Sequence, residues 1–175
     1  MNETIRSILE RRSVKKYTDE KVRKEDLDLI VQAGLYAPSG ANKQGAVMAV
    51  IQDEALIDEL ERMNAEVVGR DPDLIHNFYG AKTIILTLAD KSVPTSVYDA
   101  SLMMENLMLA AHSLGLGSCW IHRSKLMFET ERGKEILKEL GMEGEYEGVG
   151  ICLLGYAAMT PNAAPRKENR VFYKL

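Results

Sequence analysis

Two short basic clusters, one near each end of the chain, hold the side chains best suited to binding a charged ligand. The first basic cluster reads Arg11-Arg12-Ser13-Val14-Lys15-Lys16-Tyr17, and the second reads Pro165-Arg166-Lys167-Glu168-Asn169-Arg170. Guanidinium and ammonium groups beside a serine hydroxyl suit phosphate, to which they make strong charge-assisted hydrogen bonds. A protein with a formal net charge of −4 has no general need to gather cations. Together the clusters indicate a small phosphorylated ligand, although each alone is more typical of a solvated surface.

A loop of small and amide-bearing residues lies between the clusters. We call it the amide loop, and it reads Ala37-Pro38-Ser39-Gly40-Ala41-Asn42-Lys43-Gln44. Pro38 fixes its own φ angle and Gly40 permits a close backbone approach. Asn42 and Gln44 supply amide donors and acceptors. A turn that only ends a helix would explain Pro38 and Gly40 equally well, but it explains Asn42 and Gln44 less well.

Side-chain catalysis and metal binding find little support in the sequence. The three histidines lie far apart and form no paired ligand motif, so a metal site is not expected: His76, His112 and His122. Cys119 lies three residues before His122, and in a strand this spacing points the two side chains to opposite faces. Ser39 lacks the G-x-S-x-G pattern of a nucleophile elbow. A chain without such groups suits an enzyme whose cofactor carries the reaction.

Four segments of the chain resemble motifs of the nitroreductase family of FMN-dependent oxidoreductases. They are the two basic clusters, the amide loop and Leu114-Gly115-Leu116-Gly117-Ser118-Cys119-Trp120-Ile121, in the family's order and spacing. The resemblance implies electron transfer from NADH or NADPH through FMN to nitroaromatic, quinone or similar small acceptors, by a ping-pong mechanism. The alternatives are a flavin-binding or flavin-storing protein without efficient turnover, or a specialised relative such as a reductive dehalogenase.

The resemblance also implies which residues bind the cofactor, and it implies no catalytic side chain. Arg11, Ser13 and Lys15 match positions that hold the FMN phosphate, ribityl chain and pyrimidine edge, and Arg12 faces the same cofactor. Five residues of the amide loop match family positions that reach the cofactor from the other subunit: Pro38, Ser39, Gly40, Asn42 and Gln44. The resemblance also implies that the backbone of Cys119, Trp120 and Ile121 lies against the flavin ring. The side chain of Trp120 is more typical of a residue in the hydrophobic core. Arg166 matches a phosphate-binding arginine, and Lys167 is its helper.

Two departures from the family pattern affect the proposed site. Gly45-Ala46 stands where Pro-Trp is common, which is expected to widen the pocket or loosen the loop. Ala163-Ala164 precedes Pro165 where a further lysine often stands, which removes one positive charge from the phosphate clamp.

The elements that must position these residues follow from hydrophobic spacing. Helical spacing covers 5–9, 27–35, 56–63, 97–114 and 136–140. Buried strands are predicted at 46–51, 83–89 and 149–154, and residues 118–122 form a short apolar stretch. Thr4, Asp53 and Thr130 or Glu131 are expected to open three of the helices. Helices and strands intermix without regular βαβ alternation, which indicates an α+β fold. The resemblance implies a mixed, mainly antiparallel sheet flanked by helices.

The helix predicted at 97–114 is apolar almost all round, so it should be buried, and a subunit interface is a plausible cover. The last 20 or so residues lack periodicity, and we call residues 156–175 the C-terminal arm. The resemblance implies an intertwined homodimer in which this arm crosses to the partner.

Length and composition fit one globular domain covering residues 1–175. Hydrophobic residues make up 46% and charged residues 27%, as in ordinary soluble proteins. The mild acidity argues against a nucleic-acid partner. No apolar run approaches the roughly 20 residues of a membrane span, and the N-terminus has no apolar signal region, so a cytoplasmic location is expected. Cys119 and Cys152 have apolar neighbours, which suits reduced, buried thiols.

Overall fold

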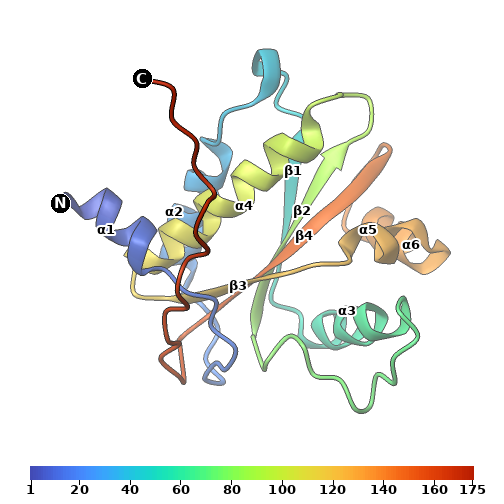
Figure 1. Ribbon diagram of the computed structural model, residues 1–175. Coiled ribbons are helices and arrows are strands. Elements are labelled where there is room, and N and C mark those ends of the chain that lie inside the picture. The colour runs from blue at the N-terminus through green and yellow to red at the C-terminus, as the bar shows by residue number, and fades with distance from the viewer.

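The computed structural model describes residues 1–175 and has a four-stranded sheet at its centre, with helices on both faces (Figure 1). The strands are β1 (Ala46–Ile51), β2 (Thr83–Asp90), β3 (Gly117–Ile121) and β4 (Tyr146–Gly155). Their order is β1-β2-β4-β3, and every neighbouring pair is antiparallel. This architecture confirms the predicted α+β class with a mainly antiparallel sheet.

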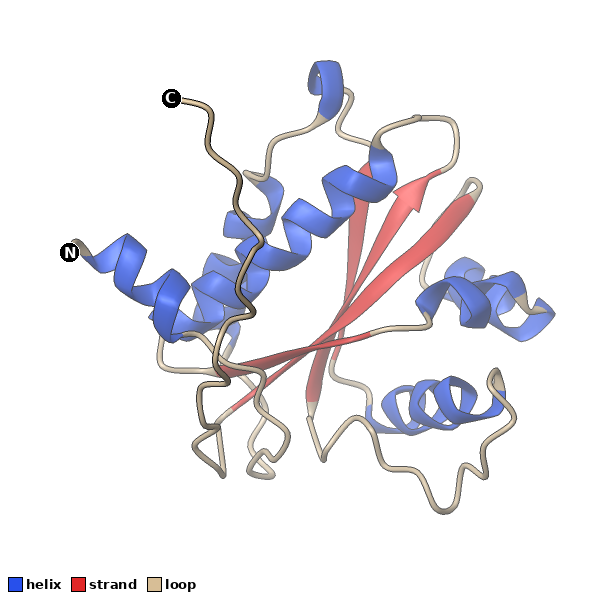
Figure 2. Ribbon diagram, viewed as in Figure 1, coloured by secondary structure: helices blue, strands red, loops and turns tan.

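Two helical layers cover the sheet (Figure 2). The helices are α1 (Glu3–Glu10), α2 (Lys24–Leu35), α3 (Glu54–Glu66), α4 (Ser96–Ser113), α5 (Ser124–Glu129) and α6 (Glu131–Glu139), with a short 3₁₀ turn at Gly40–Asn42. Helices α2 and α4 pack on one face, and α3, α5 and α6 pack on the other. None of the helices combines the length and the apolarity needed to cross a membrane.

Strand β2 shows why the sheet is covered on both faces. Its residues Ile84, Leu86 and Leu88 lie in the core beneath α3, α5 and α6. Ile85 lies in the core beneath α2 and α4. Because successive strand side chains point to opposite faces, a strand buried on both sides must be apolar at nearly every position. The continuous apolar run at 83–89 is therefore the signature of a central strand.

Most predicted element ends agree with the structure, and the exceptions have local reasons. Thr4 does not cap α1; instead the side chain of Asn2 accepts a hydrogen bond from Ile5 N at 3.0 Å, and the helix begins at Glu3. Of the two residues predicted to open α6, Thr130 is the cap, accepting from Gly133 N at 3.0 Å, and Glu131 is the first residue of the helix. The sequence analysis missed α5, because six residues are too few to display a helical period.

The C-terminal arm has no helix or strand, and it runs from the end of β4 along the outside of the molecule (Figure 1). Its large apolar side chains near the end are exposed, with Phe172 at 88% and Tyr173 at 80%. Such a run of exposed apolar residues usually marks an interaction surface.

Candidate functional site

The first basic cluster forms an extended segment that lies against β3. The backbone N–H of Val14 donates to the Ser118 carbonyl at 2.9 Å, and Ser13 forms an isolated parallel bridge with Ser118. Val14 is buried, whereas Ser13 and Lys15 on either side of it are exposed. A Cβ atom on Gly117 would lie 2.9 Å from Val14 Cγ2, so glycine allows this close approach. The packing of Val14 therefore turns the polar residues of the cluster outward.

Tyr17 anchors the other end of this segment. Its hydroxyl donates to the Val14 carbonyl at 2.9 Å, and burial raises the pKa of the phenol well above its usual range. A Cβ atom on Gly155 would lie 2.9 Å from Tyr17 Cδ1, so the ring sits directly on the last residue of β4. The aromatic residue that ends the basic cluster thus fixes the cluster between β3 and the start of the arm.

A hollow of about 300 Å³ opens beside the cluster, and we call it the arginine hollow. Arg11, Arg12, Ser118 and arm residues 157 and 159–161 are among those that line it. Arg11 Nε, Arg11 Nη1 and Ser118 Oγ are buried without a hydrogen-bond partner. The Glu105 carboxylate lies 3.8 Å from Arg11 Nε, which is too far for a hydrogen bond. Because buried donors are normally paired, these groups fit the phosphate of the cofactor that the sequence predicts.

Two further cations of the cluster, Arg12 and Lys15, are held by neighbours. Arg12 Nη1 donates to the carbonyls of Leu9 at 2.7 Å and Arg11 at 2.6 Å, so its guanidinium caps the end of α1. Lys15 Nζ lies 5.9 Å from the centroid of the Tyr79 ring, a cation–π distance. Tyr79 has φ +54°, which is unusual for an aromatic residue. The sequence analysis missed Tyr79, because only the folded chain brings it to Lys15.

The three predicted residues of β3 turn their side chains into the two cores. Cys119 and Ile121 belong to the core beneath α3, α5 and α6, and Trp120 packs against the core beneath α4. A Cβ atom on Gly150 would lie 2.3 Å from Trp120 Nε1, so the indole fills the space above that glycine. A cofactor beside β3 would therefore meet its backbone, as the resemblance implies.

Both cysteines should be unreactive in the folded protein. Burial raises the pKa of the Cys119 thiol, an effect that Ser13, Lys15 and Arg11 only partly offset, and burial also raises the pKa of Cys152. Because the thiolate is the nucleophile, iodoacetamide at neutral pH should leave both cysteines unmodified. Mass spectrometry before and after unfolding in denaturant is the measurement, and the unfolded chain should label twice. Rapid labelling of the native protein would contradict the burial described here.

The amide loop lies at the opposite end of α4 from the arginine hollow. Gly40 N donates to Asp99 Oδ1 in the first turn of α4, whereas His112 in its last turn lines the hollow. At 1.5 Å per residue, these two positions of α4 are about 20 Å apart. Asn42 and Gln44 are exposed, and Gln44 Nε2 donates to Asn42 Oδ1 at 3.0 Å. One chain thus does not bring its own amide loop to its own basic cluster.

The second basic cluster is also outside the hollow. Arg166 and Lys167 are exposed on the C-terminal arm and do not line the arginine hollow. Pro38 is exposed, and Ser39 and Gly40 are half-buried at the base of the amide loop. The predicted residues therefore lie in three places within one chain: the first basic cluster with β3, the amide loop with the start of α4, and Arg166 and Lys167 on the arm.

Comparison with known proteins gives consistent matches over nearly the whole chain. A sequence model of the Nitroreductase family matches residues 8–156. An FMN reductase (NAD(P)H) of Bacillus subtilis strain 168 is 32% identical over 136 residues, which cover 67% of this chain and 53% of that protein. A nitroreductase from Bacteroides fragilis NCTC 9343, solved with bound FMN, is 25% identical with a TM-score of 0.90 over 100% of both chains. Another from Desulfitobacterium hafniense DCB-2, also with bound FMN, is 28% identical with a TM-score of 0.88 over 100% of both chains.

Proposed function

Because this chain belongs to the nitroreductase family, we propose that it passes electrons from NAD(P)H, through FMN, to nitroaromatic, quinone or similar small acceptors by a ping-pong mechanism. The family, the FMN cofactor and the NAD(P)H-dependent oxidoreductase class that the sequence predicts are confirmed. One observation of this chain's own residues supports the proposal most directly. Arg11 and Ser118, which line the arginine hollow, have buried donor atoms that make no hydrogen bond.

Each part of the basic cluster has a distinct task in this proposal. Arg11 and Ser118 hold the phosphate with buried donors that make no hydrogen bond within the chain. Lys15, held by Tyr79, places a positive charge beside the pyrimidine edge, where negative charge collects on reduction. Bound FMN supplies the chemistry, taking a hydride from the nicotinamide and giving electrons to the acceptor. The protein orients the cofactor, and the oxidised nucleotide leaves before the acceptor enters.

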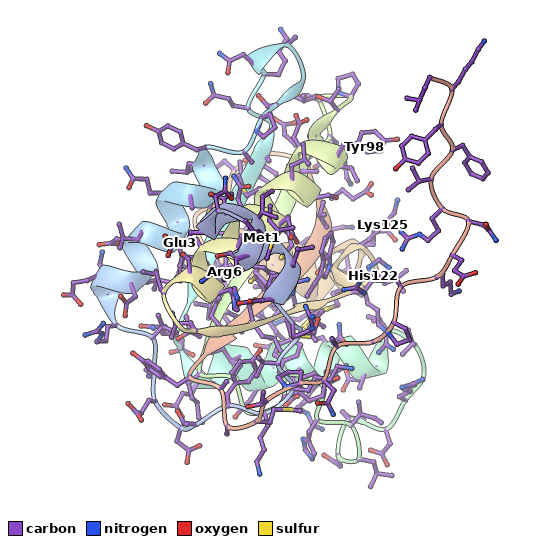
Figure 3. All side chains as sticks on the ribbon, turned by 60° about the vertical axis from the view of Figure 1, so that its left-hand side comes forward. Met1, Glu3, Arg6, Tyr98, His122 and Lys125 are labelled. Carbon is purple, nitrogen blue, oxygen red and sulfur yellow. The ribbon has the colours of Figure 1, made fainter.

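We also propose that the working form is a homodimer of one-domain subunits, each with an arm at about 156–175. Tyr98 and Leu102 of α4 are exposed apolar residues, and Figure 3 shows Tyr98 at the surface. The arm adds a second uncovered apolar set at 171–173. In the proposed dimer the amide loop of each subunit serves the basic cluster of the other, because a chain's own loop lies at the far end of α4 from its own cluster. We place the protein in the cytoplasm, where NAD(P)H is produced.

The departure at Gly45 has a packing reason. A Cβ atom on Gly45 would lie 2.8 Å from Val93 Cβ, so Val93 occupies the space that a larger residue would need. The loop is therefore packed at this point rather than loosened. A flavin-storing protein, which a loosened loop would favour, gains no support from Gly45.

Anaerobic reduction of the FMN-loaded protein tests the proposal. NADH or NADPH should remove the absorbance of oxidised flavin, and a quinone or nitroaromatic added afterwards should restore it without further nucleotide. Parallel initial-rate lines at varied nucleotide and acceptor would support the ping-pong order. A protein that binds FMN but is reduced by neither nucleotide would instead be a storage protein, and a protein that binds no FMN would contradict the whole proposal.

A further inference from the structure

A single buried carboxylate connects the amide loop to the start of α4. Asp99 is only 5% exposed, and both of its carboxylate oxygens accept hydrogen bonds. Oδ1 accepts from the backbone N–H of Gly40 at 3.2 Å, and Oδ2 accepts from the hydroxyl of Thr95 at 3.0 Å. A buried carboxylate is unfavourable unless it is hydrogen-bonded. These two donors therefore fix Asp99, and Asp99 in turn fixes Gly40.

The loop that Asp99 holds is strained. Ala41, Asn42 and Gln44 have φ angles of +50°, +55° and +50°, in the left-handed region that residues with a side chain rarely adopt. Such strain persists only where surrounding contacts enforce it, and it concentrates at functional sites. Within residues 39–44 the other hydrogen bonds are internal, as from Gln44 N to Ser39 Oγ at 3.2 Å. The bond from Gly40 to Asp99 is the one that ties these residues to another element.

Packing reinforces the same attachment. A Cβ atom on Gly40 would lie 2.4 Å from Thr95 Oγ1, so Thr95 touches the loop backbone where its own hydroxyl bonds to Asp99. Five residues along the chain, Gly45 is packed in the same way on Val93. The segment 93–99 therefore contacts Gly40 in the loop and Gly45 directly after it, and it adds one carboxylate, which leaves the loop little freedom to relax.

We infer that Asp99, supported by Thr95, is a positioning residue that keeps the amide loop in the conformation that presents Asn42 and Gln44 to the cofactor. The inference rests on the proposed function, in which this loop acts on the flavin of the partner subunit. Asp99 is buried beneath the loop and acts through it. Fixed hydrogen bonds to a cofactor ring set its reduction potential and position the second reactant. By holding the loop, the Asp99 carboxylate therefore affects both the potential and the position of the reactant without touching the flavin.

Four variants of the FMN-loaded protein test the inference. Asp99→Ala removes both acceptors, Thr95→Val removes one donor at constant shape, and Asp99→Asn keeps an acceptor for Gly40. Ser101→Ala is the matched control, because its hydroxyl bonds only to the Val97 carbonyl of the same helix, at 2.8 Å. The measurements are hydrogen–deuterium exchange of residues 39–44, the midpoint potential of the flavin, and its anaerobic reduction rate.

Asp99→Ala should speed amide exchange in the loop, shift the flavin potential, and slow reduction roughly tenfold or more, as expected when a hydrogen bond to a charged group is lost. FMN affinity should change little, because the phosphate contacts lie elsewhere. Thr95→Val should act in the same direction and more weakly. Asp99→Asn should recover most of the rate, and Ser101→Ala should behave as the unaltered protein.

Unchanged loop exchange in both Asp99→Ala and Thr95→Val would overturn the inference. Faster exchange with an unaltered potential and rate would also overturn it, since the loop would then be held by Asp99 without acting on the flavin. If Asp99→Ala fails to fold, Thr95→Val decides the question. Failure of the unaltered protein to bind FMN would count against the proposed function, and exchange in the flavin-free protein would still decide whether Asp99 holds the loop.

Discussion

Arg11→Ala should weaken FMN binding by roughly 1.5–3 kcal/mol, the value of a hydrogen bond to a charged group, or about ten- to a hundredfold in Kd. Arg11 carries two buried nitrogen atoms without a hydrogen-bond partner, and an anion in the arginine hollow would satisfy them. The loss should be confined to phosphate, so riboflavin should bind the variant as it binds the unaltered protein. Titration of flavin fluorescence measures both ligands directly.

Arg6→Ala is the control for the loss of an arginine at the N-terminal end of the chain. Figure 3 shows Arg6 on α1, where it is exposed and lies outside the arginine hollow. FMN affinity should be unaltered in this variant, because an exposed charge contributes little to a ligand that it does not touch. Equal FMN affinity in Arg11→Ala and the unaltered protein would show that the unpaired donors of the hollow do not bind phosphate.

The predictions that succeeded rest on local patterns. Asp53 and Thr130 cap helices as predicted, because a cap depends only on the next three residues. The central strand at Thr83–Asp90 was visible as an apolar run, because burial on both faces requires one. Such features depend on residues that are close together in the chain, so they can be predicted from one sequence.

The features that the sequence analysis missed depend on partners far along the chain. Asp99 accepts from Gly40 across 59 positions, and nothing in the helical pattern of 97–114 distinguishes this carboxylate from a solvated one. Tyr79 likewise meets Lys15 only after the sheet has formed. Arg12 shows the opposite case. The resemblance implies a cofactor contact, but its guanidinium caps α1, so a role at the cofactor stays a prediction.

Truncation after Asn162 should destroy the dimer and most of the FMN affinity together. The truncation leaves arm residues 157–161 in place around the arginine hollow but removes Arg166, Lys167 and the exposed apolar run at 171–173. Burial of a large apolar side chain contributes roughly 1.5–3 kcal/mol, so loss of this run should raise the dimer dissociation constant at least about a hundredfold. Sedimentation velocity over a dilution series measures the assembly, and flavin titration measures the site.

The double variant Arg166→Ala/Lys167→Ala in the full-length chain separates the two roles of the arm. It keeps the apolar run, so the dimer should persist while FMN affinity falls, because the charged donors alone are missing. The amide loop and the basic cluster of one chain lie at opposite ends of α4. A monomer should therefore lack the amide loop at its cofactor site, even if its phosphate-binding residues are intact. A truncated chain that stays dimeric and binds FMN with full affinity would refute this account of the arm.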